Sequence, residues 1–201
     1  MIHPETELKS ISQEKGIGVV ATEFIPKGTI TWIFDPFDRV FTPNDVLCLK
    51  PLFRNFIDKY AYRDHDGNFV LCWDHSRFVN HSYHSNCIST AYNFELAVRD
   101  IYPGEEITND YGYLNLSEPF YAIPEPGSDR LVVMPDDLLN YHKLWDEQLK
   151  DAFSHFNLVA QPLGDLVDPI YQHKVRLVAA GKEEMDSILN CYFDSGNRMA
   201  A

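Results

Sequence analysis

The residue types best suited to chemistry gather in two stretches of the chain, residues 77–86 and 95–113. The first reads R-F-V-N-H-S-Y-H-S-N, and the second reads E-L-A-V-R-D-I-Y-P-G-E-E-I-T-N-D-Y-G-Y. They combine Asn80, His81 and Tyr111 with several carboxylates, and such side chains can bind a polar ligand, orient it or exchange a proton with it. This concentration of polar groups indicates a functional site and not merely a core.

The second stretch also predicts the elements that position its polar residues. Residues 95–101 alternate as a strand does, with apolar residues set among polar neighbours. The Pro-Gly pair at 103–104 predicts a turn, because Pro fixes φ and Gly tolerates positive φ. Residues 107–108 begin another extended piece, so we expect Tyr111 at the end of a short strand and close to the Asn80–His81 loop.

Both stretches, in this order and at this spacing, resemble the SET domain of protein lysine methyltransferases. The resemblance covers roughly residues 8–113. It implies an α+β fold, in which a β-rich SET domain with several small sheets and knot-like threading precedes a helical C-terminal region. We place the SET domain at residues 1–116 and the helical region, at the post-SET position, at residues 117–201.

The resemblance also implies an activity and a set of site residues. It implies a protein-lysine N-methyltransferase that uses S-adenosylmethionine, releases S-adenosylhomocysteine and modifies a histone or another basic protein. Tyr111 occupies the family's catalytic tyrosine position, and Tyr60 resembles its first active-site tyrosine; the alternative for Tyr60 is packing across a hairpin. The positions that match the family's cofactor contacts are Lys15, Gly16, Ile17, Gly18, Asn80, His81 and Tyr111.

Methyl transfer to a lysine amine makes physical demands that such a site can meet. The amine must first lose its proton, although the pKa of a free lysine is about 10.4. A narrow aromatic channel disfavours the charged ammonium and so lowers that pKa. Alignment and electrostatics then supply most of the catalysis, and a tyrosine hydroxyl can hold the reacting groups through hydrogen bonds and weak C–H···O contacts.

The chain departs from the family pattern in two places that bear on function. Asn109 stands where many members carry Phe or Tyr, so the number of methyl groups added stays open. No cysteine-rich segment follows Tyr111, so another element must cover the cofactor and complete the lysine channel. We expect aromatic residues downstream to provide that cover, and the candidates are Tyr113, Phe120, Tyr121 and Trp145.

A metal site is a competing interpretation of the same region. The residues whose types and spacings would suit zinc are Cys72, His75, His81, His84 and Cys87. Four-ligand geometry is demanding, and these offsets on a strand and loop need not converge. We therefore expect no metal there.

Composition limits the partners and the compartment. The net charge of −13 is spread over both halves of the chain, and it favours a basic peptide while disfavouring direct contact with nucleic acid. No run approaches the roughly 18 apolar residues of a membrane helix, and the N-terminus lacks a secretory signal pattern. We expect an intracellular protein, cytoplasmic or nuclear, with four reduced cysteines; non-classical secretion would leave no trace in the sequence.

The rest of the chain predicts mainly helices. Thr42 followed by Pro43 predicts a helix N-terminus. Residues 60–63 alternate and predict a strand that begins at Tyr60, and residues 64–68 predict the hairpin turn that follows it. Beyond residue 113 the apolar period changes from 2 to about 3.6. The predicted elements there are a loop over 117–130 and helices over 136–156, 168–181 and 185–192. In the second of these helices, Asp168 is the expected N-cap, Gly181 the expected C-terminus, and Ile170 is expected to face inward.

An alternative function from a different class is a catalytically silent SET module that binds cofactor or a basic protein partner. The retained Tyr111 and Asn80-His81 argue against it, whereas Asn109 and the missing cysteine-rich segments leave it open. Cofactor binding without turnover on any basic protein would distinguish the two.

Overall fold

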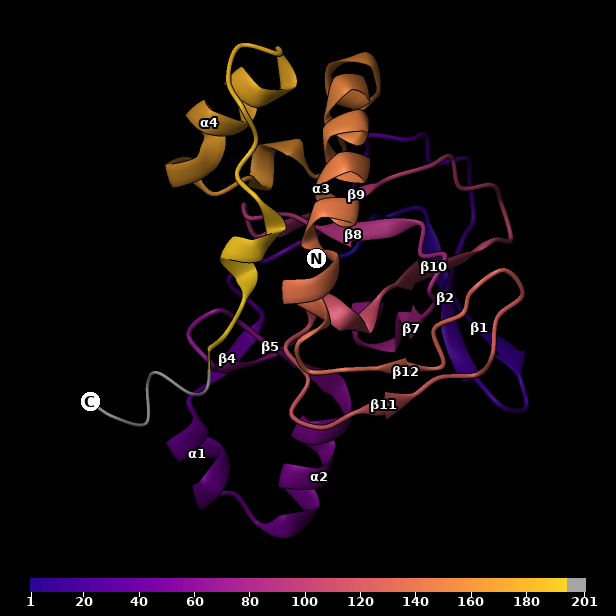
Figure 1. Cartoon of the computed structure of the whole chain (residues 1–201), viewed down its shortest axis with the longest axis vertical. Helices are drawn as coiled ribbons and strands as arrows, with labels where there is room; N and C mark the ends of the chain where they lie inside the picture. The colour runs from indigo at the N-terminus through magenta and orange to yellow at the C-terminus, as the bar shows by residue number, and fades with distance from the viewer. Residues whose placement is uncertain (195–201) are drawn as a thin grey trace.

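The computed structural model describes residues 1–194 and has an α+β fold (Figure 1). Small sheets occupy the middle of the molecule. Helices α1 (Pro43–Cys48) and α2 (Pro51–Tyr60) lie at one end, and α3 (Asp137–His155) and α4 (Pro169–Ala179) lie at the other. The predicted fold class, with several small sheets and a helical C-terminal region, is confirmed.

The largest sheet joins segments that are far apart in the sequence. Its strands, in spatial order, are β1 (Thr6–Ser12), β2 (Gly16–Ala21), β10 (Glu106–Asn109) and β7 (Asn80–His81). Neighbours are antiparallel except β10 and β7, which run parallel with Thr108 opposite Asn80 and Asn109 opposite His81. This parallel pair brings the two polar stretches of the sequence side by side.

The part of the chain that the structure describes has three smaller sheets. One has the order β3 (Ile30–Ile33), β9 (Phe94–Ala97) and β8 (Cys87–Ser89). Another has the order β4 (Arg39–Phe41), β6 (Phe69–Leu71) and β5 (Ala61–Arg63). The third pairs β11 (Phe120–Tyr121) with β12 (Val132–Val133).

The strand predicted over 95–101 is shorter than expected, and it is not half-buried. All four residues of β9 are buried, including Glu95, because the sheet is covered on both faces. Phe94 and Leu96 pack into the core beneath α3, whereas Ala97 belongs to a second apolar cluster. The alternation of apolar and polar residues predicts that Glu95 faces solvent, and this prediction is wrong because Glu95 is buried.

Helix boundaries follow the predicted capping residues. The Thr42 hydroxyl accepts from Asp45 N at the start of α1, and the Asp168 carboxylate accepts from Ile170 N at the start of α4. Gly181, with φ of 66°, follows the end of α4. Within residues 1–194, single turns of 3₁₀ helix are formed by His75–Phe78, Tyr111–Tyr113, Phe156–Leu158, Gly164–Leu166 and Ile188–Cys191.

Four local predictions were wrong. The third C-terminal helix is only the 3₁₀ turn Ile188–Cys191, and the loop over 117–130 contains β11. Ile170, expected to face inward, is 72% exposed in the first turn of α4. Tyr60, expected in a strand, is the last residue of α2, because Pro51 starts a helix that continues to it.

The C-terminal helices share a core with the strands. Trp145, Leu149 and Phe153 of α3 are buried in one cluster with Phe94 and Leu96 of β9. Burial of each such side chain stabilises the fold by about 1.5–3 kcal/mol. Helix α3 is therefore held against the sheet by the packing of its apolar face.

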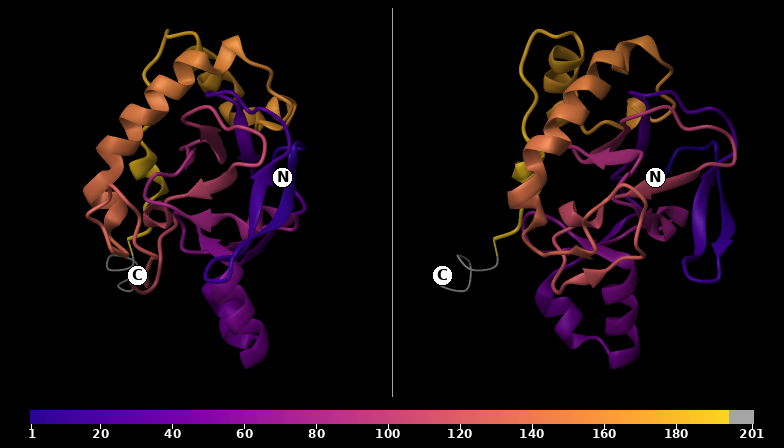
Figure 2. Two further views of the ribbon diagram at one scale, coloured as in Figure 1. Left: turned by 90° about the vertical axis from the view of Figure 1, so that its right-hand side faces the viewer. Right: turned by 45° about the vertical axis from the view of Figure 1, so that its right-hand side comes forward.

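The end of the described chain runs along one side of the molecule, from the helical end toward β4 and β5 (Figures 1 and 2). The Asn115 side-chain amide donates to Arg63 O at 3.0 Å and to Cys191 O at 2.8 Å, and its oxygen accepts from Phe193 N at 3.0 Å. Asn115 therefore ties residues 191–193 to β5. Within residues 1–194, no helix has the length and apolar character needed to cross a membrane, and all four cysteines are free thiols.

Candidate active site

Tyr111 is fixed by its own backbone and by its hydroxyl. β10 ends at Asn109, and Asp110 caps the 3₁₀ turn Tyr111–Tyr113 by accepting from Gly112 N at 2.9 Å. The Tyr111 hydroxyl donates to Val79 O at 2.9 Å, and its backbone N–H donates to His81 Nδ1 at 3.1 Å. Burial raises the pKa of Tyr111 to about 12, so the hydroxyl stays neutral and its oxygen can still accept a hydrogen bond.

His81 is a neutral, buried imidazole. Burial lowers its pKa to about 4. Since Nδ1 accepts from Tyr111 N, the single proton of the neutral ring belongs on Nε2. His81 Nε2 and the hydroxyl of Tyr83, whose ring lies 4.4 Å from that of His81, are both buried without a hydrogen-bond partner in the described chain. These two atoms can therefore form hydrogen bonds with a polar ligand, and the site made by His81 and Tyr83 is called the His81 corner below.

Asn80 links the site to the start of β2. Its side-chain amide donates to Ile17 O at 3.1 Å and to Glu106 Oε1 at 2.8 Å. The other carboxylate oxygen of Glu106 pairs with Lys15 Nζ at 3.0 Å. The structure thus brings together Lys15, Ile17 and Asn80, three of the residues that are expected to bind the cofactor.

The two glycines of this corner play different structural parts. Gly18 permits close packing, because an added Cβ would lie 2.6 Å from Glu106 Oε1 and 2.7 Å from Asn80 Nδ2. Gly16 has φ of 77° and faces open space, so its backbone is accessible to a bound molecule. Together with the unpartnered donors near His81, this geometry fits a polar ligand bound between the start of β2 and Tyr111.

Tyr60 and Tyr111 line one cavity of about 400 Å³. Tyr60 packs on Phe56 and Phe78, with ring centroids 4.8 and 5.5 Å away. The other aromatic walls of the cavity come from Trp32, Tyr62, Phe94, Tyr113 and Phe120. Carboxylate and amide groups also reach it from Glu95 and Asn109, so the cavity combines an aromatic lining with a few buried polar groups, as ligand sites commonly do.

Only one of the four aromatic candidates covers Tyr111. The Phe120 ring lies 5.3 Å from that of Tyr111 and 5.7 Å from that of His81. Tyr121 is 78% exposed. Trp145 packs edge to face on Tyr113 in the main core and does not line the cavity, whereas Tyr113 lines it without stacking on Tyr111.

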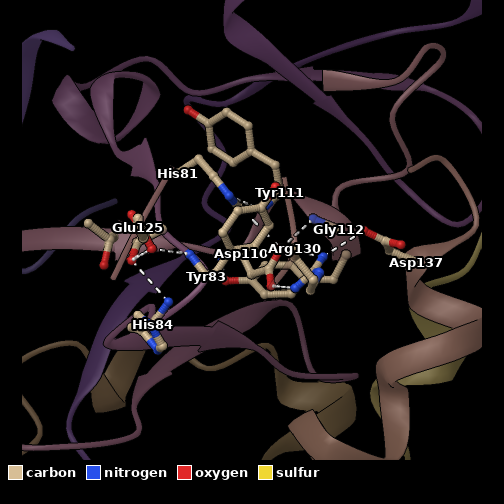
Figure 3. Close-up of polar contacts among 12 residues, drawn as sticks. His81, Tyr83, His84, Asp110, Tyr111, Gly112, Glu125, Arg130 and Asp137 are labelled. Atoms are coloured by element: carbon tan, nitrogen blue, oxygen red, sulfur yellow. Dashed lines mark hydrogen bonds and ion pairs between the residues drawn. The ribbon is translucent and has the colours of Figure 1, made fainter. Parts of the chain in front are cut away.

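The segment that carries Phe120 is held down by charged groups (Figure 3). Arg130 reaches both Asp110 and Asp137, pairing with the latter at 2.6 Å. Its guanidinium lies between the rings of Tyr83 and Tyr141, 4.6 and 4.3 Å from their centroids. These contacts link the residue next to Tyr111 to the first turn of α3.

Glu125 provides a second attachment. Its carboxylate accepts from Tyr83 N at 2.8 Å and from the Ser82 hydroxyl at 3.0 Å (Figure 3). The segment over 116–136 is therefore joined at two points to the polar loop that follows β7.

The candidate zinc ligands have other partners. His75 Nε2 contacts the Thr6 hydroxyl, His84 Nε2 contacts Pro126 O, and the buried Cys87 thiol bonds the Asn86 side chain. Across the described residues, no group of three or more His, Cys, Asp or Glu side chains is arranged to hold a metal ion.

Comparison with known proteins identifies the family. The family model for the SET domain matches residues 16–112. The chain contains a SET domain. The match spans the start of β2, the Asn80–His81 strand and Tyr111, so the cluster described above lies within the SET domain.

Among solved structures, a Plasmodium falciparum protein provisionally named a histone methyltransferase is similar to this SET-domain chain. It is 23% identical with a TM-score of 0.40, over 55% of this chain and 95% of the other. No curated protein sequence matches.

Several residues of the site were not anticipated from the sequence. The sequence pattern predicts an alternating strand around Glu95 and a loop over the segment that contains Glu125 and Arg130. A buried carboxylate at Asp110 needs a positive partner, but the sequence does not say which of the 17 Lys and Arg side chains supplies it.

Proposed function

We propose that this SET-domain protein is a protein-lysine N-methyltransferase that uses S-adenosylmethionine. The observation that carries the proposal is the position of Tyr111, which lines an aromatic cavity while its backbone contacts the His81 corner. S-adenosylmethionine, when bound, supplies the electrophilic methyl group. The chain's own residues bind, orient and deprotonate the amine.

Tyr111 and Tyr60 are proposed to orient the amine. The Tyr111 hydroxyl is anchored by donating to Val79 O, which leaves oxygen lone pairs to accept from a substrate N–H or a polarised C–H. The aromatic walls, including Tyr60, exclude water and lower the pKa of an entering lysine. Orientation of the amine and exclusion of water both depend on where these side chains lie, and they can accelerate a reaction that has no covalent enzyme intermediate.

The cofactor is proposed to lie against the start of β2 and the His81 corner. Gly16 offers an open backbone, and His81 Nε2 with the Tyr83 hydroxyl offer unpartnered polar atoms. Asn80 and Lys15, joined through Glu106, hold this corner in place. Phe120 covers Tyr111 and His81 in the role that a cysteine-rich segment has elsewhere in the family.

The substrate is proposed to be a lysine in a basic protein, such as a histone. The net charge of −13 favours association with such a partner. We expect the protein to act in the cytoplasm or nucleus, where basic substrates of this kind are made and used.

A methyl-transfer assay tests the proposal. Purified protein is incubated with labelled S-adenosylmethionine and either core histones or a cell lysate. Tyr111→Phe is the test variant, and Tyr121→Phe is the matched control because Tyr121 is 78% exposed. We expect label on lysine in the wild type and the control, and a loss of at least about 100-fold in Tyr111→Phe.

The outcomes separate the alternatives. Label on histones places the substrate in chromatin, and label only in the lysate keeps the enzyme but moves the substrate elsewhere. Cofactor binding without label on any protein would reject the enzyme and favour the silent module.

A further inference from the structure

The cavity that contains Tyr111 holds a buried carboxylate that the proposed function does not yet use. Glu95 is 6% exposed and lies in the middle of β9. Its Oε1 accepts from the Asn109 side-chain amide at 2.8 Å and from the Ser89 hydroxyl at 3.2 Å. Within residues 1–194, no Lys, Arg or His forms an ion pair with it. Burying a carboxylate without a positive partner lowers the stability of the folded protein, so a functional role is a reason for Glu95 to be present.

A second buried polar atom lies beside Glu95. Asn109 is 7% exposed, and its Oδ1 has no hydrogen-bond partner in the described part of the chain. Its Nδ2 is committed to Glu95, so Oδ1 is the atom left to accept. Both residues line the cavity, and Asn109 is two residues before Tyr111.

We propose that Glu95 and Asn109 form the binding site for the substrate's primary ammonium group. This inference rests on the proposed function for the identity of the substrate, but the binding site itself can be tested without turnover. An alkylammonium has three N–H donors and one positive charge, which match a carboxylate, an unpartnered amide oxygen and the aromatic walls of the cavity.

The cationic side chains that line the cavity are engaged elsewhere. Lys59 is exposed and lies over the ring of Tyr60, 5.1 Å from its centroid. Arg77 Nη1 donates to the carbonyls of Trp73 and Asp74, each at 2.8 Å, and Arg63 stacks on Phe69 and Phe193. The N-terminal ammonium of the chain pairs with Asp35 at 2.6 Å, and its charge lowers the pKa of Glu95 only as the smallest of the influences on that group. Glu95 thus remains the buried carboxylate available to an incoming cation.

The acid–base properties of the site fit the same role. Burial raises the pKa of Glu95 to about 7, so the group can exchange a proton near neutral pH. The titratable groups whose pKa responds to Glu95 are Tyr62, Cys87 and Tyr113, and burial raises the pKa of each, so they stay neutral there. The buried Cys72 thiol in the cavity wall, with a pKa raised to about 12, also stays neutral.

Proton balance gives Glu95 a defined step. The ammonium N–H bond breaks and an O–H bond forms on the Glu95 carboxylate, which leaves a neutral amine with a free lone pair. The proton stays on Glu95 until the product leaves and water re-enters the cavity. Asn109 Oδ1 accepts a remaining N–H and fixes the rotation of the amine.

The test measures Glu95 directly. The side-chain carboxyl carbons of glutamate are labelled with ¹³C, the Glu95 signal is assigned by its absence in Glu95→Gln, and its pH titration is followed by NMR. The probe is n-butylammonium chloride, which matches the lysine side chain, and the control is KCl at the same ionic strength. We expect the probe to lower the pKa of Glu95 by about 1–3 and KCl to leave it unchanged.

The expected result should persist in Tyr111→Phe, which separates binding from turnover. If Glu95→Gln fails to fold, Ser89→Ala provides the assignment instead, since loss of the Ser89 hydroxyl shifts the same signal. A pKa of Glu95 that n-butylammonium leaves unchanged overturns the inference, even if methyl transfer is found. A lowered pKa without methyl transfer on any protein keeps the cation site and rejects the proposed enzyme.

Discussion

Replacing Arg130 with Met tests whether the segment that covers Tyr111 is held by electrostatics. Arg130 is the positive partner of both Asp110 and Asp137, and its side chain is 19% exposed. Met keeps much of the apolar stem that packs between Tyr83 and Tyr141 but removes the charge. The substitution therefore isolates the ion pairs from the packing.

The magnitude follows from the burial of Asp110, whose side chain is 2% exposed. Removing one partner of a buried pair leaves the other charge uncompensated, which costs about 3–5 kcal/mol. Gly112 N still donates to Asp110 in the variant, so we expect the lower part of that range. A loss of this size is a large fraction of the stability of a typical domain.

The loss of stability should depend on pH in a defined direction. Burial raises the pKa of Asp110, while Arg130 opposes that rise. A carboxyl with a raised folded-state pKa loses stability as pH rises through that pKa. Without Arg130 the pKa of Asp110 rises further. The difference between wild type and Arg130→Met is therefore largest at neutral pH and shrinks as acid protonates Asp110.

Equilibrium urea unfolding, followed by tryptophan fluorescence, measures both effects. The matched control is Arg99→Met, because Arg99 pairs with Glu105 while 48% exposed, and such surface pairs contribute about 0–1 kcal/mol. A loss in Arg130→Met no larger than in Arg99→Met, or one that stays constant from neutral to mildly acidic pH, would refute the electrostatic attachment.

Three further predictions concern the site. Gly18→Ala should weaken cofactor binding on the order of tenfold by calorimetry, because the new Cβ would displace Asn80, which it meets at 2.7 Å; unchanged affinity contradicts this. Glu95→Gln should be more stable than wild type above pH 7 by about 1–3 kcal/mol. The pKa of Glu95 is raised to about 7, so the wild type loses stability as pH rises through that value, whereas Gln does not titrate. Equal urea midpoints of the two proteins at alkaline pH would contradict this prediction. Phe120→Ala should speed cofactor dissociation in a chase experiment, whereas Tyr121→Ala, at a side chain 78% exposed, should not.

The expected stability gain of Glu95→Gln has a wider meaning. A neutral isostere at a buried position would normally be preferred, because an unpaired buried charge is unfavourable. Retaining a carboxylate beside Asn109 is consistent with selection for binding at the expense of stability.

Much of the site could be predicted because its signals are local. The Pro-Gly turn and the polar residues near Tyr111 lie within one continuous stretch, and Asn80 and His81 lie within another. The caps at Thr42 and Asp168 are also local, since a side chain bonds a backbone N–H two or three residues away. Residue types and short spacings determine such features.

Other features could not be predicted because they depend on packing between distant segments. Covering of β9 on both faces buries Glu95, and alternation within one strand gives no sign of this. Phe120 and Tyr121 are adjacent and chemically similar, yet only Phe120 contacts Tyr111. Their difference comes from the register of β11 with β12, in which neighbouring residues point to opposite faces.

The sequence by itself determined the family, the α+β class and the tyrosine at the end of β10, because these follow from contiguous motifs and periodicity. Only the tertiary structure decided how the site is closed and charged. Arg130 neutralises Asp110 across 20 residues, and Glu95 is left without a cation beside Asn109. Coulombic and desolvation energies depend on distance and burial in space, and neither quantity is fixed until the chain has packed.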